Sequence, residues 1–240
     1  MPKIAVIVRC EKVLELNKNF GTSRTLAILM GVVFLIFLIT GMVLPVLPLH
    51  LQGRLGQSTF VVGLVAGVQF FAALVSRVWA GSFSDRNGPK SAMLVGLAMA
   101  IAAGALYLTS LTLLEVPIAS VVVLAIGRAF LGGAECFVIV GAVSWALRLS
   151  GGAHAGRAIA NMGTVLYVGL ATGAPIGSLL FEAFGFQSLA LATLALPLLA
   201  LLVILPLPTL PPEHQEGRNF FAVLKSVWLP GLGLSFASLG

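Results

Sequence analysis

Charged side chains are scarce in this sequence, because Asp, Glu, Lys and Arg together make up only 9% of its 240 residues. A soluble domain typically carries about 25% charged residues. Apolar residues reach 59%, and so few charges cannot cover the surface of a water-soluble fold of that composition. The scarcity excludes a soluble protein and indicates a chain that crosses a membrane several times.

Cysteine and histidine are too few and too scattered for a disulfide framework or a metal site. The two cysteines, Cys10 and Cys136, lie far apart along the chain, so no pairing follows from them. The histidines, His50, His154 and His214, have none of the short spacings that zinc ligands need. We therefore expect no metal and no other cofactor.

Two further classes of protein are excluded in the same way. The formal net charge is +6, but no basic face interleaved with aromatic residues accompanies it, so we expect no nucleic-acid partner. An integral membrane enzyme needs clustered His, Asp or Glu at an interface. The chain offers only Asp85 in a loop and one Arg and one Glu within an apolar stretch, so we expect no enzyme.

Long apolar stretches are abundant, and six of them are long enough to cross a bilayer as a helix, which takes roughly 20 residues. They cover residues 26–49, 60–83, 91–114, 118–147, 158–181 and 188–207. Pro45 and Pro48 should bend or end the first helix near its far end. The stretches predict an all-α integral membrane protein with a six-helix bundle over residues 25–207.

The two ends of the chain lie outside this bundle. Residues 1–24 carry too many charges for a membrane span or a cleaved signal peptide, and we expect a tail. Residues 208–228 are typical of a polar linker with a short interfacial helix. The apolar residues 229–240 rise only about 18 Å as a helix, against a hydrocarbon core of roughly 30 Å. We expect them to begin a truncated seventh helix.

The Lys and Arg residues outside the six stretches indicate the orientation of the bundle, because such residues gather on the cytoplasmic side. If the spans alternate in direction, all of these residues except Arg54 fall on one side. The tail and the linker are therefore predicted to be cytoplasmic.

The loop between the second and third stretches, residues 81–90, combines three charges with three helix breakers. Gly81 should let the second helix approach a neighbour closely, and Gly88 should allow a sharp reversal before Pro89 in the next helix. Asp85 should face the positive N-terminal end of that helix.

The pattern Gly-x-x-x-Asp-Arg-x-Gly-x-Lys in this loop resembles the signature loop between helices 2 and 3 of the major facilitator superfamily of transporters. The matching positions are Gly81, Asp85, Arg86, Gly88 and Lys90. The resemblance implies the N-terminal six-helix bundle of that fold, built as a three-plus-three inverted repeat, and a role for the loop in the conformational cycle. An ordinary turn that collects positive charge on the cytoplasmic side is the alternative.

Arg128 and Glu135 lie within the fourth stretch, where ionisable side chains are costly and usually face a cavity or a partner. Seven residues span about 10 Å of helix, so both project from one face. Glu135 can exchange protons there, or the two side chains can form a buried link that only fixes helix packing. The run Arg128 to Gly132 resembles the fourth-helix motif of the superfamily, which implies that Arg128 takes part in substrate or proton coupling.

The fifth stretch contains closely spaced small residues and a proline, which permit close helix contact and a bend. These residues are Gly169, Gly173, Pro175 and Gly177. The run is similar to the antiporter motif of exporters in the superfamily, and a generic packing face is the alternative. Further candidates for lining a cavity are Gln69, Trp145, Asn161 and Tyr167.

Three runs resemble the bacterial drug-efflux-like and arabinose-efflux-like permeases, namely those at residues 44–48, 69–72 and 173–177. This resemblance implies a secondary transporter of the bacterial inner membrane that exports a small molecule in exchange for protons. The expected partners are the lipid bilayer, the small-molecule substrate and a C-terminal six-helix half that this chain lacks. The alternatives are a proton-linked uptake symporter and a non-transporting fragment of a transporter.

Overall fold

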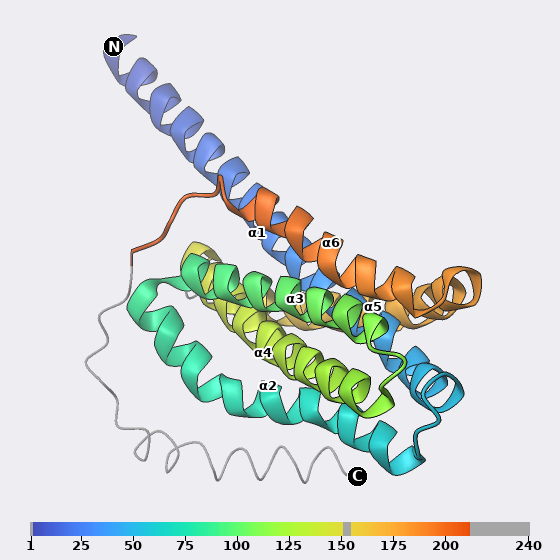
Figure 1. Ribbon diagram of the computed structural model, residues 1–240. Helices are drawn as coiled ribbons and strands as arrows, with labels where there is room; N and C mark the ends of the chain where they lie inside the picture. Colours follow the sequence, from blue (N-terminus) through green and yellow to red (C-terminus); the bar gives the residue numbers. More distant parts are fainter. Residues whose placement is uncertain (1, 151–154, 212–240) are drawn as a thin grey trace, which may run out of the picture.

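The structure, a computed structural model, describes residues 2–150 and 155–211, with side chains described from residue 23 onward. The described part of the chain contains six α-helices (Figure 1). They are α1 (Pro2–Gly53), α2 (Thr59–Asn87), α3 (Pro89–Thr112), α4 (Pro117–Ser150), α5 (Ala155–Phe184) and α6 (Phe186–Ile204). The predicted interfacial helix and the predicted seventh helix lie outside the described residues.

All six helices are long and apolar enough to cross a membrane by length and composition, which confirms the predicted all-α bundle. The first helix already begins at Pro2, so the predicted tail and the first span form one helix. This helix continues through Pro45 and Pro48 to Gly53, so the expectation that it could end at these prolines is wrong. A proline removes one backbone hydrogen bond. The residues between the two prolines, Val46 and Leu47, are fully buried, so packing against neighbouring helices continues through this part of the helix.

Single glycines separate two pairs of consecutive helices. Gly88 has a φ of 87° between α2 and α3, and Gly185 has a φ of 71° between α5 and α6. Glycine adopts this left-handed backbone without the penalty that a side chain brings. The predicted reversal at Gly88, with Pro89 starting the next helix, is confirmed. The second turn is shorter than the predicted gap between 181 and 188, because α5 extends to Phe184.

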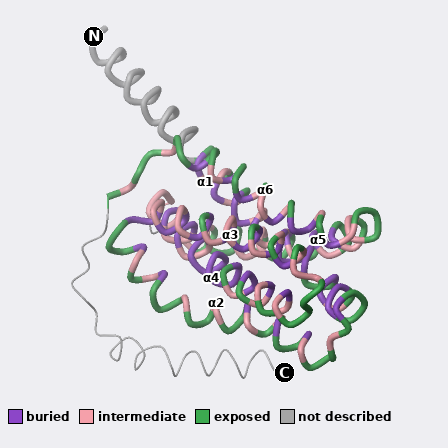
Figure 2. The backbone as a smooth tube through the Cα atoms, in the orientation of Figure 1, coloured by how far each residue is buried: buried purple, intermediate pink, exposed green. Residues whose placement is uncertain are grey.

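The contacts between the helices include one pair that the predicted inverted repeat would relate. If α1, α2 and α3 correspond to α4, α5 and α6, then the contact between α1 and α5 corresponds to the contact between α4 and α2. Both contacts are extensive, and α3 packs against α6 across the relating axis. The second and fifth helices are the least buried of the six (Figure 2). They therefore form the outer edges of the bundle, and α4 lies at its centre.

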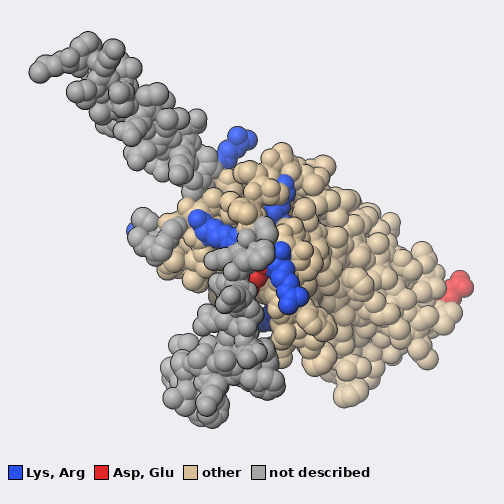
Figure 3. Space-filling model, turned by 90° about the vertical axis from the view of Figure 1, so that its left-hand side faces the viewer, with Lys and Arg blue, Asp and Glu red and all other residues tan. Residues whose placement is uncertain are grey.

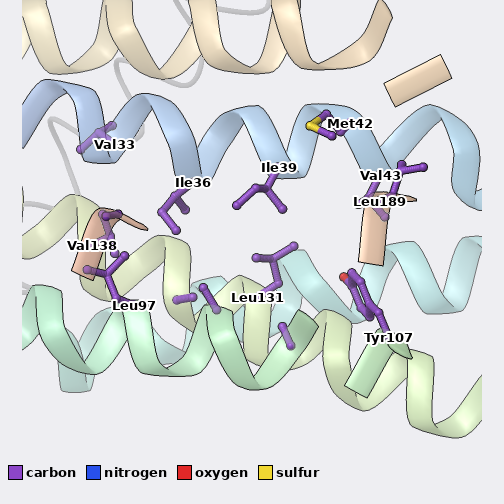
Figure 4. Packing of buried hydrophobic residues seen from close by; sticks show 14 of the residues in the cluster. Val33, Ile36, Ile39, Met42, Val43, Leu97, Tyr107, Leu131, Val138 and Leu189 are labelled. Atoms are coloured by element: carbon purple, nitrogen blue, oxygen red, sulfur yellow. The ribbon is translucent and has the colours of Figure 1, made fainter. Parts of the chain in front are cut away.

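The apolar core lies between α1, α3, α4 and α6. Figure 4 shows Ile36 and Ile39 of α1 facing Leu97 of α3 and Leu131 of α4, and all four side chains are fully buried. Helices within a membrane associate through close van der Waals contact rather than through the hydrophobic effect. This packing fixes the distance between α1 and α4, and the buried polar side chains described next lie between these two helices and α2.

Candidate functional site

Three polar side chains from three helices meet inside the apolar bundle. The carboxylate of Glu135 in α4 accepts hydrogen bonds from the Thr40 hydroxyl of α1 and from the Gln69 amide of α2. The Gln69 Nε2 also lies 3.5 Å from the Thr40 Oγ1. All three side chains are buried. We call Thr40, Gln69 and Glu135 the polar cluster.

A glycine one turn before Glu135 lets the polar cluster form. A Cβ atom at Gly132 would lie 2.0 Å from the carbonyl oxygen of Gln69, which is closer than any real contact. The backbones of α2 and α4 therefore touch at this point, as small residues permit in membrane bundles. The touching backbones bring the Gln69 amide within reach of Glu135.

Arg128 lies nearly two turns before Glu135 on α4 and is completely buried. Its guanidinium is near the Tyr107 hydroxyl of α3, but among the described residues none of its three nitrogen atoms has a hydrogen-bond partner. No ion pair joins it to Glu135 within that part of the chain. The sequence correctly indicated two ionisable groups inside the bundle, whereas the buried Arg–Glu link that was the alternative is not formed.

The loop at the end of α2 differs from its expected structure at Gly81. A Cβ atom at Gly81 would meet no described atom within 4 Å, so the close approach that we expected there is not made. Asp85 lies in the last turn of α2 with an exposed side chain. It forms no capping hydrogen bond at the start of α3, and its expected interaction with the positive end of that helix stays a prediction. α2 continues without a break to Asn87, and only Gly88 separates it from α3.

Lys90 has a contact that the sequence did not reveal. Its Nζ donates hydrogen bonds to the carbonyl oxygens of Leu205 and Leu207, at 2.8 Å and 2.6 Å, just after the end of α6. The last carbonyls of a helix lack partners within the helix, and a lysine near them is favourable. Nearby, a Cβ atom at Gly88 would lie 3.0 Å from the carbonyl oxygen of Leu210. The loop is thus in contact with the segment that leaves the bundle.

A second basic residue donates a hydrogen bond to the segment that follows α6, residues 205–211. Arg148, near the end of α4, donates a hydrogen bond of 2.7 Å from its Nη1 to the carbonyl oxygen of Pro211. Arg86, the other cation of the loop, is exposed. Lys90 and Arg148 therefore reach the segment 205–211 from two different helices.

The glycines of α5 form a seam against α1. Cβ atoms at Gly169, Gly173 and Gly177 would lie 2.8 Å, 2.4 Å and 2.2 Å from carbonyl oxygens of that helix. The predicted close helix contact is confirmed. Pro175 points to the exposed side of the helix. A role of these residues in antiport stays a prediction.

The candidate cavity-lining residues do not come together. Gln69 belongs to the polar cluster, and Trp145 is fully buried in the core. Asn161 and Tyr167 of α5 are exposed, and Tyr167 has 71% of its surface accessible.

Within the described residues, no group of three His, Cys, Asp or Glu side chains could hold a metal ion.

Sequence reasoning missed Thr40, which completes the polar cluster. Thr40 is a lone hydroxyl residue within the apolar run of the first span, directly before Gly41. A Cβ atom at Gly41 would lie 2.4 Å from the carbonyl oxygen of Leu170, so this glycine belongs to the contact with α5. Hydroxyl residues in membrane helices often bond to their own backbone, and the sequence alone does not distinguish that role from a contact with a distant carboxylate.

The chain is similar to known transporters. The family model of the Major Facilitator Superfamily matches residues 29–240. The chain is 37% identical over 207 residues to the Uncharacterized MFS-type transporter YhhS of Escherichia coli (strain K12), covering 86% of this chain and 51% of that protein. It is 35% identical over 220 residues to the Uncharacterized MFS-type transporter STM4428 of Salmonella typhimurium, covering 92% of this chain and 57% of that protein. The chain thus spans about half the length of these curated relatives.

Proposed function

Because the chain belongs to the major facilitator superfamily, we propose that it forms the N-terminal half of a secondary transporter. In this proposal the transporter exports a small molecule across the bacterial inner membrane in exchange for protons. Glu135 carries the proton, and Arg128 couples the carboxylate to the substrate. The observation that carries the proposal is the polar cluster, a buried carboxylate held by two neutral side chains.

The polar cluster has hydrogen-bonding partners for both protonation states of Glu135. When the carboxylate is ionised, the Thr40 hydroxyl and the Gln69 amide donate to it. When it is protonated, the Thr40 hydroxyl can turn to the Ile36 carbonyl oxygen, 3.4 Å away. The Oε1 of Gln69 is buried without a partner and can accept the additional proton of a carboxyl group. A buried group that is satisfied in both states can gain and lose a proton without leaving an unpaired polar atom.

Arg128 supports this proposal because no residue in the described part of the chain forms an ion pair with it. A guanidinium paired directly with Glu135 would hold the carboxylate in its ionised form, since separating a buried pair leaves an uncompensated charge. Apart from its proximity to the Tyr107 hydroxyl, the Arg128 guanidinium has no hydrogen-bond partner among residues 2–150 and 155–211, which leaves it able to respond when a substrate arrives. The residue therefore affects the proton affinity of Glu135 from a distance, and this influence changes with substrate binding.

The distribution of charge supports an N-terminus in the cytoplasm. Figure 3 shows Lys and Arg side chains gathered at the end of the bundle where α1 enters it. The described cations near that end are Arg24, Arg86, Lys90, Arg148 and Arg157, against Arg54 at the other end. Such residues accumulate on the cytoplasmic side of bacterial inner-membrane proteins. Alkaline phosphatase fused after Arg218 should be inactive, and an active fusion would contradict this orientation.

Proton flux in liposomes tests the coupling. The complete transporter is reconstituted with a pH-sensitive dye inside, and ethidium or arabinose is added outside as the probe. Antiport makes the interior more alkaline because protons leave as the probe enters, whereas symport makes it more acidic. The Glu135→Gln variant should abolish the pH change.

A matched carboxylate provides the control for this experiment. Glu182 is exposed near the end of α5, so Glu182→Gln should leave the pH change intact. An acidified interior would replace export by the uptake alternative. If Glu135→Gln transports protons as the unmodified protein does, Glu135 has a packing role only and the proposed mechanism is wrong.

A further inference from the structure

A pocket of about 450 Å³ opens at the end of the bundle opposite to the loop of α2 and α3. Its walls come from the last turns of α1 and α3 and from the turn between α5 and α6. It contains no residue of α2 or α4, so it is separate from the polar cluster. Its volume lies within the range of small-molecule sites.

One polar side chain in the wall of this pocket is buried without a hydrogen-bond partner. His50 has 3% of its surface exposed and its Nε2 makes no hydrogen bond in the described structure. Its ring stacks on Phe186, with ring centroids 4.1 Å apart and planes within 12°. Tyr107 packs against the same phenylalanine at 6.0 Å. The His50 imidazole is therefore held in position by its stacking on Phe186, which in turn packs against Tyr107.

One cation accompanies the imidazole. Arg54 lines the pocket one turn after His50, and its backbone N–H bonds to the carbonyl oxygen of His50. The Arg54 side chain is exposed and has no ion pair in the described part of the chain, although Glu115 and Glu182 lie at this end of the bundle. The pocket therefore combines a free guanidinium with a fixed imidazole.

Apart from Gln187, the remaining side chains of the wall are apolar, and this favours a lipid over a soluble ligand. Leu111 and Leu114 of α3 and Phe181 and Phe184 of α5 line the pocket beside Arg54. The pocket lies at the ends of helices that are long enough to cross a membrane, and such helix ends reach the level of the lipid headgroups. A ligand that matches these walls has an anionic head and an apolar body.

We propose that this pocket binds the phosphate group of a membrane phospholipid. The Arg54 guanidinium pairs with the phosphate, as guanidinium groups do in planar, bidentate contacts. The His50 imidazole in the wall of the pocket is the second polar group of the site, and the start of the acyl chains lies on Leu111 and Phe184. Basic pockets between transmembrane helices on the cytoplasmic side bind lipid headgroups by the same chemistry, and this proposal extends that chemistry to the opposite end of the bundle.

Native mass spectrometry of the complete, detergent-purified transporter tests this assignment. Phosphatidylglycerol should remain bound, whereas diacylglycerol with the same acyl chains, which lacks the phosphate, should not. Arg54→Gln should weaken the binding of phosphatidylglycerol about tenfold, the effect of losing a hydrogen bond between charged groups. Arg157→Gln is the matched control, because Arg157 is exposed at the opposite end of the bundle, and it should bind as the unmodified protein does.

A second variant keeps the test decisive if Arg54→Gln fails to fold. His50→Phe preserves the ring that stacks on Phe186 and removes both nitrogen atoms, so it should also reduce binding while the thermal unfolding temperature is retained. Equal retention of the two lipids, or unchanged binding by both variants, would overturn the proposal. Binding of glycerol 3-phosphate, a soluble phosphate compound, is measured as a further comparison. If this soluble phosphate binds as tightly as the lipid, the occupant is a free phosphate compound and the lipid assignment is wrong.

Discussion

Gly177 of α5 lies so close to Met42 of α1 that a Cβ atom at the glycine would be 2.2 Å from the methionine carbonyl oxygen. The two backbones are in direct contact there. Replacing Gly177 with Ala must push the helices apart, and overpacking of this kind costs about 1–3 kcal/mol. We expect Gly177→Ala to lower the thermal unfolding temperature of the protein in detergent.

Gly163 is the matched control for this prediction because it lies on the same helix and a Cβ atom there meets no described atom within 4 Å. Gly163→Ala should leave the unfolding temperature unchanged or raise it, since alanine favours a helix over glycine. Equal losses for Gly163→Ala and Gly177→Ala would show that the seam does not limit the stability of the bundle.

Lys90 should stabilise the exit of the chain from α6. Lys90→Met keeps the length and apolar body of the side chain but removes both hydrogen bonds to the carbonyl oxygens of Leu205 and Leu207. The expected loss is about 1 kcal/mol, because the site is partly exposed and water can replace part of the interaction. The measurement is thermal unfolding, with Arg86→Met as the control, since Arg86 is exposed and bonds to no described residue. A larger loss for Arg86→Met would argue against a specific role of Lys90.

The helices and their order could be predicted from the sequence because apolar length alone determines which segments can span a membrane. Helix ends were less predictable. The loop 81–90 contains three helix breakers, and only Gly88 interrupts the helix, because Gly81 is accommodated within α2 and Pro89 fits the first turn of α3. A glycine or proline ends a helix only where its backbone adopts a non-helical conformation, as Gly88 does with its positive φ. The sequence does not show which glycine adopts such a conformation.

The sequence identified the ionisable residues of the candidate site, but it did not identify the side chains and carbonyl groups that they contact. Glu135 and Arg128 stood out because ionisable residues are rare inside a membrane. Thr40 and the contact of Lys90 with the end of α6 depend on how distant helices come together. α2 meets α4 through a backbone contact at Gly132, and α3 meets α6 through one at Gly104; the important feature at both positions is the absence of a side chain.

Asp85 should affect the rate of transport and not the affinity for substrate. It lies 16 residues after Gln69 on the same helix, which is about 24 Å along the axis, so it cannot contact a substrate beside the polar cluster. In Asp85→Asn the conformational cycle should slow, with a lower turnover rate and an unchanged dissociation constant for the probe. Flux and equilibrium binding of the same probe provide the measurement. Weaker binding with normal turnover is the result that this prediction does not allow.

Thr40 should be required for coupling through its hydroxyl and not through its volume. Thr40→Val has nearly the same shape but cannot donate to Glu135, so the ionised carboxylate keeps only the Gln69 amide as a donor. The loss of one hydrogen bond to a buried charge is worth about 1.5–3 kcal/mol, and proton flux driven by the probe should fall about tenfold or more. Thr40→Ser keeps the hydroxyl and loses one methyl group, so it should retain most of the flux. If valine and serine reduce the flux equally, packing at this position matters and the hydroxyl does not.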